Sequence, residues 1–185
     1  MISKGKAIKN EIRTKIQEVE NEHDIKLSTT EKILLSISGP IVTILDTLYG
    51  EVRLFVLEQK MKKADKEISE LLDIDEGAEI DFREVIVHKN GKPLVYAISY
   101  IPKERCSDNV ISELLNEEKT TGKILVDHEI ETIRRTNNIS IEKPDAMVAN
   151  LFNSTEKMLV REYVMVHKKK VVIWTKEIYP IGQFK

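Results

Sequence analysis

The stretch AEIDFREVIVHKNGKPLVYAISYIP, residues 78–102, decides the fold of this chain. Two runs rich in β-branched and aromatic residues flank Asn90-Gly91, which is the strongest two-residue signal for a hairpin turn. The stretch therefore predicts two antiparallel strands. In the first strand Arg83 falls on the same face as two valines, because alternate residues share a face. A charged side chain on an apolar strand face needs an explanation, since arginine is seldom fully buried unless it is paired.

The rest of the chain reads as helices followed by further strands. Residues 6–23 carry isoleucine and valine at helical spacing. Residues 28–50 predict two short helices, with a cap at Ser28 or Thr29, a break at Gly39-Pro40 and a stop at Gly50. The chain closes in a second hairpin, residues 156–180, which turns at residues 168–170. The remaining elements are a strand at 51–61, helices within 62–77, 107–118 and 144–153, and a turn or helix that becomes a strand within 120–141.

Hairpins that follow one another favour an antiparallel sheet, so the pattern predicts the α+β class rather than alternating α/β. We expect a single domain over residues 1–185, with a central antiparallel sheet flanked by helices. The N-terminal helices, within residues 6–49, are expected to cover the sheet rather than to form a separate domain. The sequence shows no repeat, no low-complexity segment and no linker.

Composition excludes several functional classes. The chain has 29 Lys and Arg against 31 Asp and Glu in 185 residues, so no basic field points to nucleic acid or to a membrane surface. Cys106 is the one cysteine, which excludes an internal disulfide or a thiolate metal cluster. The start of the chain lacks a signal peptide, and the most apolar run is broken by Gly39, Pro40 and Asp46, so we expect a cytoplasmic protein. The histidines lack metal-ligand spacing, and no glycine-rich phosphate loop is present, so no metal and no cofactor are expected.

Three polar residues stand on predicted apolar strand faces: Arg83, Glu177 and Arg134. Each has an ordinary interpretation. Arg83 could reach solvent along a buried stem, Glu177 could pair with a lysine across the strand, and Arg134 is followed by Arg135, so one of these two faces out in any case. Together, however, two inward arginines and one inward glutamate leave positive charge unmatched. A small ligand with a carboxylate would match it, because arginine grips a carboxylate with two parallel hydrogen bonds.

The order of motifs resembles the chorismate pyruvate-lyase family, in particular its archaeal-type branch, from about residue 31 to 180. The resemblance rests on EKILLSISGPIVTILDTLYG, VLEQKMKKAD, FREVIVHKNGKPLVYAISYIP, TGKIL, IETIRR and REYVMVHKKKVVIWTKEIYP. It implies a chorismate lyase-like fold, in which an antiparallel sheet holds an internal ligand beneath helical flaps.

The resemblance also implies roles for individual residues. Arg83 would grip the carboxylate of the benzoate ring, and Glu177 would meet the ring hydroxyl. The chain departs from the bacterial branch at Ile98, where a second ligand-binding arginine would fall, and at Thr121, where a proline is common. Further substrate-binding positions implied by the resemblance are Gly122, Leu125, Val42 and Thr43, with Arg134 as a replacement for the missing charge.

The implied activity is the cofactor-free elimination of pyruvate from chorismate to give 4-hydroxybenzoate, with inhibition by that product. The main alternative is a ligand-binding domain that senses a small anion without chemistry, related to the effector domains of a class of bacterial transcription regulators. A structural protein with no ligand is a third reading. The oligomeric state, monomer or homodimer, stays open.

Overall fold

The structure is a computed structural model, which describes residues 11–115 and 120–184. In it the hairpin of residues 78–102 forms two neighbouring interior strands of the sheet. Its strands are β2 (Glu79–Lys89) and β3 (Lys92–Pro102), which pair antiparallel. Asn90 has φ 50° and Gly91 has φ 81°, the pair of positive φ angles that a type I′ turn requires. The predicted hairpin and its turn are therefore confirmed.

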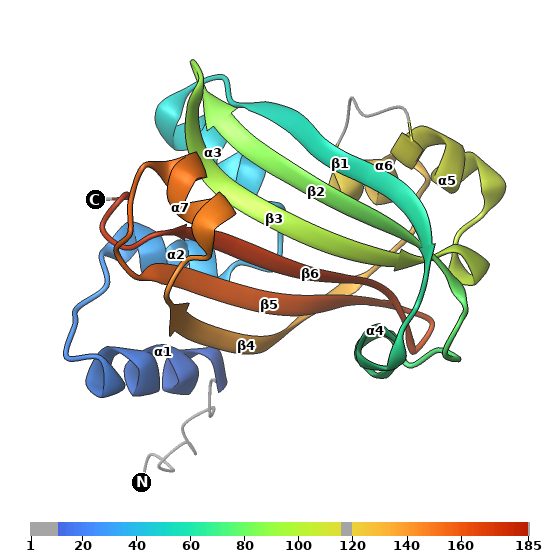
Figure 1. The fold of residues 1–185 in the computed structure, drawn as a ribbon, viewed down its shortest axis with the longest axis horizontal. Coiled ribbons are helices and arrows are strands. Elements are labelled where there is room, and N and C mark those ends of the chain that lie inside the picture. The colour runs from blue at the N-terminus through green and yellow to red at the C-terminus, as the bar shows by residue number, and fades with distance from the viewer. Residues whose placement is uncertain (1–10, 116–119, 185) are drawn as a thin grey trace, which may run out of the picture.

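Six strands in the order β1-β2-β3-β6-β5-β4 form one fully antiparallel sheet (Figure 1). The second predicted hairpin joins β5 to β6, and Lys168 and Lys169 form its turn with positive φ angles. The outer strands are β1 beside β2 and β4 beside β5. Their bounds are β1 (Arg53–Lys63), β4 (Ile133–Glu142), β5 (Met158–His167) and β6 (Lys170–Pro180).

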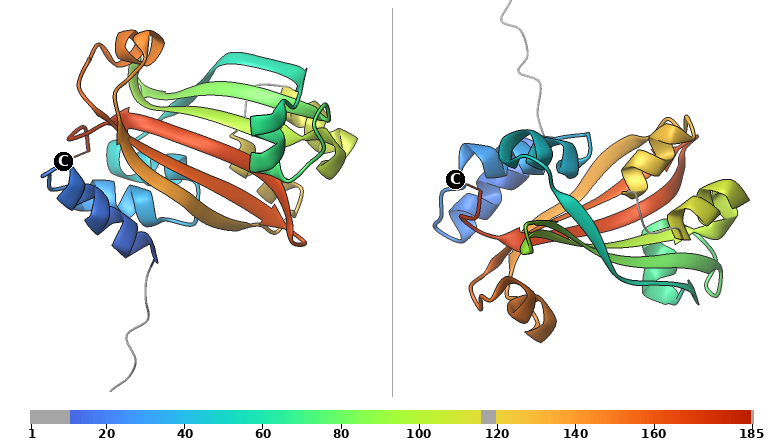
Figure 2. Two further views of the ribbon diagram at one scale, coloured as in Figure 1. Left: turned by 60° about the horizontal axis from the view of Figure 1, so that its bottom comes forward. Right: turned by 90° about the horizontal axis from the view of Figure 1, so that it is seen from above.

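The sheet face that carries Arg83, here called the inner face, is covered by helices at its two ends. One end packs against α1 (Glu11–Glu22), α2 (Thr29–Ser36) and α3 (Ile41–Tyr49). The other end packs against α5 (Asp108–Leu115) and α6 (Thr121–Asp127). The helices thus leave the middle of the inner face between two separate groups (Figure 2).

The opposite, outer face is covered by α4 (Lys66–Leu72) and α7 (Ala146–Phe152). Figure 2 shows α7 on the side of the sheet away from the N-terminal helices. A short 3-10 turn, η1 (Lys103–Arg105), follows β3. Helices on both faces of a single sheet make the described residues one α+β domain, as the sequence predicts.

The N-terminal helices begin and end at the predicted signals. Ser28 caps α2 in a capping box with Glu31, and Gly50 ends α3 with φ 77°. The break at Gly39-Pro40 separates the two helices. The helix expected from residue 6 is described from Glu11 onward, so residues 6–10 of that prediction lie outside the described residues. No helix among the described residues is long and apolar enough to cross a membrane.

Candidate active site

Strand register brings the polar residues of the inner face into two neighbouring rows. In the first row Arg83 lies opposite Ser99, Ser99 opposite Thr175, and Thr175 opposite Tyr163. In the second row Glu177 lies between its partners Ala97 and Arg161. Four strands therefore supply one polar floor, here defined as Arg83, Ser99, Thr175, Tyr163, Glu177 and Arg161.

A cavity lies above this floor, where the two groups of helices leave the inner face open. Pro40 at the start of α3 and Gly122 at the start of α6 both line it from above. The two segments nearly meet, since a Cβ atom on Gly122 would lie 3.7 Å from Cγ of Pro40. The apolar walls are Ile41, Val42, Leu54, Val85, Val87, Val95, Ala97, Met165 and Ile173. An apolar cavity with a few convergent polar groups is the usual form of a small-molecule site.

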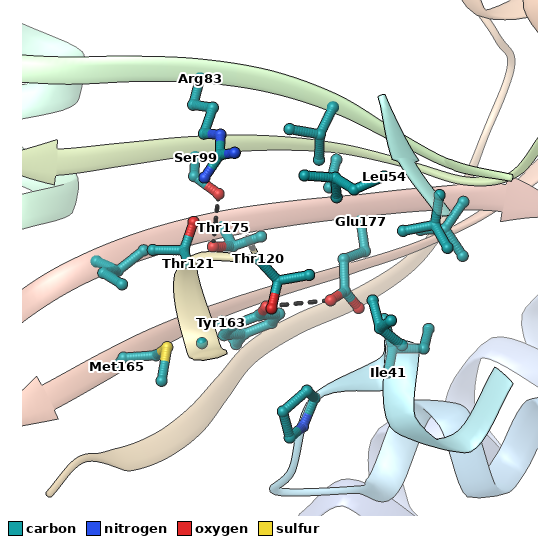
Figure 3. Close-up of a pocket in the computed structure, with 18 of the residues that line it drawn as sticks. Ile41, Leu54, Arg83, Ser99, Thr120, Thr121, Tyr163, Met165, Thr175 and Glu177 are labelled. Carbon is teal, nitrogen blue, oxygen red and sulfur yellow. Dashed lines mark hydrogen bonds between the residues drawn. The ribbon is translucent and has the colours of Figure 1, made fainter. Parts of the chain in front are cut away.

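Arg83 lies at one end of the floor, with a side chain that is 1% exposed. Its guanidinium points toward the Ser99 hydroxyl (Figure 3). Ser99 shares a hydrogen bond of 3.0 Å with Thr175. The burial of Arg83 contradicts the interpretation that it reaches solvent along its stem. The strand carries this arginine inward, into the cavity wall.

A buried carboxylate, Asp81, lies two residues before Arg83 on the same face. Burial raises the pKa of Asp81 to about 6, while a hydrogen bond from Gln59 and the charge of Arg83 act in the opposite direction. The Gln59 amide donates to Asp81 Oδ2 over 2.9 Å. Arg83 therefore has a carboxylate of the protein itself, Asp81, as a neighbour outside the polar floor.

Asp81 should make stability depend on pH in a definite direction. Its pKa is about 6 in the folded protein and 3.8 for an ordinary solvated aspartate, so the folded state binds the proton more tightly. This contribution favours folding below pH 4 and is lost as the pH rises through 6. We expect the stability of the wild type relative to Asp81→Asn to fall by on the order of 3 kcal/mol between pH 4 and pH 7.5.

Urea denaturation of both proteins at the two pH values measures this difference. The exposed Asp75 offers a matched control, because Asp75→Asn removes a carboxylate without removing a buried one. An equal stability difference between wild type and Asp81→Asn at both pH values would show that Asp81 does not titrate as described.

Glu177 is held by two donors from β5. Its Oε2 atom lies 3.1 Å from Nε and 2.8 Å from Nη2 of Arg161, and its Oε1 atom accepts a hydrogen bond of 3.0 Å from the Tyr163 hydroxyl. The cross-strand partner is thus a buried arginine and not a lysine. Burial raises the pKa of Tyr163, and the charge of Glu177 adds to this effect. Tyr163 therefore keeps its proton and serves as a donor.

Arg161, which the sequence reasoning missed, is fully buried beneath the cavity. Burial lowers its pKa, but the charge of Glu177 raises it, and the net direction is upward. Its Nη1 atom donates to the carbonyl oxygens of Leu34, over 2.7 Å, and Ile37, over 3.3 Å, where α2 ends. One guanidinium therefore joins Glu177 to the segment that leads to Gly39-Pro40.

A signal for Arg161 was present in the sequence. Leu159, Arg161, Tyr163 and Met165 alternate along β5 and share the inner face, as Arg83 shares it with two valines on β2. The criterion that selected Arg83 applies equally to this strand.

Arg134 on β4 lines the cavity, whereas Arg135 is exposed. The Arg134 Nη1 atom donates to the Gly39 carbonyl oxygen. Its guanidinium carbon lies 4.2 Å from the centre of the Tyr163 ring. Arg134 is therefore the inward member of the Arg-Arg pair, and it contacts both the floor and the segment above it.

The structure gathers most, though not all, of the sequence-predicted positions around the cavity. Those that line it are Arg83, Glu177, Gly122, Val42 and Arg134. Two positions do not line it. Leu125 is buried in the apolar core shared by α5 and α6, and Thr43 is exposed on α3.

Position 98, where the resemblance implies a second ligand-binding arginine, faces away from the cavity and is occupied by Ile98. It lies opposite Glu84 and Lys176, on the outer face, and packs beneath α7. The pleat therefore turns position 98 away from the cavity. The positive charge opposite Arg83 comes from β4 and β5 instead, through Arg134 and Arg161.

Metal-ligating groups and the single cysteine are the other features that the sequence raises. Within it no group of three His, Cys, Asp or Glu side chains is placed to hold a metal ion. Cys106 is half-buried near the end of β3, and burial raises the pKa of its thiol to about 11. A thiol with a raised pKa is a poor nucleophile at neutral pH.

Comparison with known proteins places this geometry in a family. The sequence profile described as "Chorismate pyruvate-lyase Rv2949c-like" matches residues 35–185. A protein of Methanocaldococcus jannaschii, "Putative lyase MJ0807", is 31% identical over 162 residues, which cover 84% of this chain and 80% of that protein.

Two solved structures of similar fold come from an effector domain and from the C-terminal domain of a repressor. The effector domain of PhnF from Mycobacterium smegmatis has a TM-score of 0.65 at 17% identity, over 78% of this chain and 89% of that chain. The C-terminal domain of the histidine utilization repressor from Pseudomonas syringae pv. tomato has a TM-score of 0.62 at 16% identity, over 73% of this chain and 94% of that chain. At such identities the likeness shows the fold alone.

Proposed function

Because this chain belongs to the Rv2949c-like chorismate pyruvate-lyase family, we propose that it eliminates pyruvate from chorismate and releases 4-hydroxybenzoate. The observation that carries the proposal is the placement of Arg83 and Glu177 in one apolar-walled cavity. They stand on β2 and β6, two strand spacings apart, or about 10 Å between backbones. Glu177 is also two residues further along β6 than Thr175, which is in line with Arg83, and both side chains reach inward, so we place one six-membered ring between them.

Each end of such a ring has a suitable partner. Arg83 would hold the ring carboxylate with its fork, and the apolar walls would hold the ring itself. Glu177 would accept a hydrogen bond from the ring hydroxyl. Although its two oxygens already accept from Arg161 and Tyr163, a carboxylate offers about four acceptor positions, so it has capacity for the ligand.

The reaction needs orientation more than it needs a reagent. The ether bond between ring carbon and enolpyruvyl oxygen breaks, and its electron pair leaves with the oxygen. A ring proton departs, and the electrons of that C–H bond complete the aromatic ring. The released enolate takes up one proton at its methylene carbon, which balances the proton lost from the ring, and becomes pyruvate. Aromatisation drives this elimination, so a site that fixes the ring and stabilises the departing oxygen accounts for catalysis.

The proposal is tested by a single-turnover experiment with protein in excess over chorismate. Quenched samples are separated by chromatography, and pyruvate and 4-hydroxybenzoate are measured against time. Equal amounts of the two products, formed faster than in protein-free buffer, would support the lyase. Excess protein matters here, because slow release of a tightly held product would hide activity in a steady-state assay.

The second candidate function is a sensor of a small aromatic acid. The similar fold of the regulator effector domains favours it. A sensor would use Arg83 in the same way and would bind without chemistry. In the single-turnover experiment a sensor retains chorismate unchanged and forms no pyruvate above the protein-free rate.

Product inhibition is a further expectation of the proposed function. The product keeps the ring carboxylate and the hydroxyl, the two groups assigned to Arg83 and Glu177. We expect 4-hydroxybenzoate to inhibit competitively against chorismate and to raise the melting temperature, since a ligand of the folded state stabilises it. Benzoate is the matched control. Because it lacks the hydroxyl, it should bind more weakly by about 10-fold, the value of one lost hydrogen bond to a charged group. Equal binding of the two acids would argue against the role of Glu177.

A further inference from the structure

We propose that Arg134 binds the second carboxylate of a dianionic substrate, the one carried by the group that leaves. Arg134 would then be the residue by which the site distinguishes substrate from aromatic product. This inference rests on the proposed function and extends it to one side chain. It is carried by the charges around the cavity, by the order of the strands and by the contacts of Arg134 itself.

The charges around the cavity leave Arg134 without a counter-ion among the described residues. Arg161 is matched by Glu177, and Arg83 has the buried Asp81 beside it. The recorded partners of Arg134 are neutral: the Gly39 carbonyl oxygen and the face of the Tyr163 ring. Its Nε atom is buried and has no hydrogen-bond partner in the described part of the chain.

A guanidinium with neutral partners and a buried Nε–H that lacks an acceptor is suited to bind an anionic group of the ligand. Its planar fork offers parallel N–H groups, and a carboxylate accepts two of them at once. The face of the Tyr163 ring lies 4.2 Å from the guanidinium carbon, and this cation–π contact helps to hold the guanidinium in place. Arg134 is thus preorganised, and binding a carboxylate would satisfy the Nε donor that the protein itself leaves without an acceptor.

The strand order places Arg134 on the correct side of the proposed ring. From Arg83 the strands follow in the order β2, β3, β6, β5 and β4, so Arg134 stands on the Glu177 side of Arg83 across the sheet. Along the strands Arg134 lies opposite Met165, and its guanidinium reaches over the ring of Tyr163, whose hydroxyl donates to Glu177. In chorismate the carbon that bears the enolpyruvyl ether adjoins the carbon that bears the hydroxyl. With the ring carboxylate at Arg83 and the hydroxyl at Glu177, the enolpyruvyl carboxylate therefore extends from the Glu177 end of the ring, where β5 and β4 follow.

The same arginine also contacts the segment above the cavity. Its bond to the Gly39 carbonyl oxygen links it to Pro40, which lines the cavity next to Gly122. When the leaving group departs as pyruvate, Arg134 loses its anion, whereas Arg83 keeps the ring carboxylate of the product. Pyruvate is therefore held by Arg134, and 4-hydroxybenzoate is held by Arg83.

The test compares chorismate with 4-hydroxybenzoate in Arg134→Gln. We expect kcat/KM for chorismate to fall by about 10- to 100-fold, the value of a charge-assisted hydrogen bond. The inhibition constant of 4-hydroxybenzoate should stay within about 3-fold of wild type, since the product lacks the second carboxylate. Arg134→Lys keeps the charge without the fork, and its kcat/KM should lie between the two.

Arg135→Gln is the matched control, because Arg135 is the adjacent, exposed arginine of the same strand. It should behave as wild type toward both compounds. An equal loss for chorismate and 4-hydroxybenzoate in Arg134→Gln would assign Arg134 a structural role, and no loss for either would remove it from the site. Both outcomes overturn the inference.

Failure of the inference is distinguishable from failure of the proposed function. Wild-type protein that forms no pyruvate contradicts the proposed function, whatever Arg134 does. In that event calorimetric dissociation constants for chorismate and 4-hydroxybenzoate replace kcat/KM and the inhibition constant. A selective loss of chorismate affinity in Arg134→Gln would then still support the inference, and a non-selective change would still contradict it.

Discussion

Replacing Arg83 with alanine is expected to lower kcat/KM for chorismate by on the order of 10³-fold, which corresponds to about 4 kcal/mol of transition-state stabilisation. The substitution removes two parallel hydrogen bonds to the ring carboxylate and the orientation that they impose, so kcat should fall together with affinity. Arg83→Lys should recover only part of the activity, because an ammonium group cannot hold both carboxylate oxygens in one plane.

Folding must be followed in the same experiment, because Arg83 neighbours the buried Asp81. Circular dichroism and thermal melting separate a folded, inactive variant from an unfolded one. Arg53→Ala is a suitable control, since Arg53 is an exposed arginine on the adjacent strand β1. Near-normal turnover in Arg83→Ala would remove Arg83 from the proposed mechanism.

Among the substitutions proposed for this protein, Arg161→Met should produce the largest loss of stability. Arg161 is fully buried, and its removal leaves Glu177 and the carbonyl oxygens of Leu34 and Ile37 without their charged donor. Removal of one partner from a buried ion pair costs about 3–5 kcal/mol. For a chain of this length each 1 kcal/mol shifts the melting temperature by about 2–4 °C, so a decrease of roughly 10 °C is expected.

A double variant separates the charge from the packing. Arg161→Met combined with Glu177→Leu removes both charges, and it should be more stable than Arg161→Met alone, because no buried charge then lacks its partner. The exposed Arg135→Met controls for loss of an arginine in general. If Arg161→Met melts with the wild type, or if the second substitution adds its full cost to the first, the buried pair does not stabilise the fold as described.

Local signals in the sequence predicted the strands and their turns correctly. Asn90-Gly91 supports positive φ at both positions, and such a turn sets the first pairs of its hairpin. A shift of the register between Val87 and His88, which no turn signal predicts, then places Arg83 opposite Ser99. The capping box at Ser28 and the stop at Gly50 likewise depend on residues within one helical turn. These features could be predicted because each depends on neighbours in the sequence.

Part of the site was beyond such reasoning. The partner of Glu177 depends on which residues of β5 and β6 lie opposite each other, and the contact of Arg161 with the Leu34 carbonyl oxygen joins residues 127 positions apart. A pattern within one strand shows that a side chain such as Arg83 or Arg161 points inward. It does not show which helix end or which other strand that side chain contacts. The placement of Ile98 on the outer face and the approach of Gly122 to Pro40 are of the same long-range kind.

The polar floor has a consequence for how this architecture diversifies. The row of Arg83, Ser99, Thr175 and Tyr163 draws one residue from each of four strands. A single inserted or deleted residue inside any of these strands would turn its member of the row to the opposite face. A length change between two members of the row is therefore disruptive, whereas exchange of side chains within the row leaves the backbone intact. Point substitution within the row can thus change which ligand the cavity accepts while the sheet itself is kept.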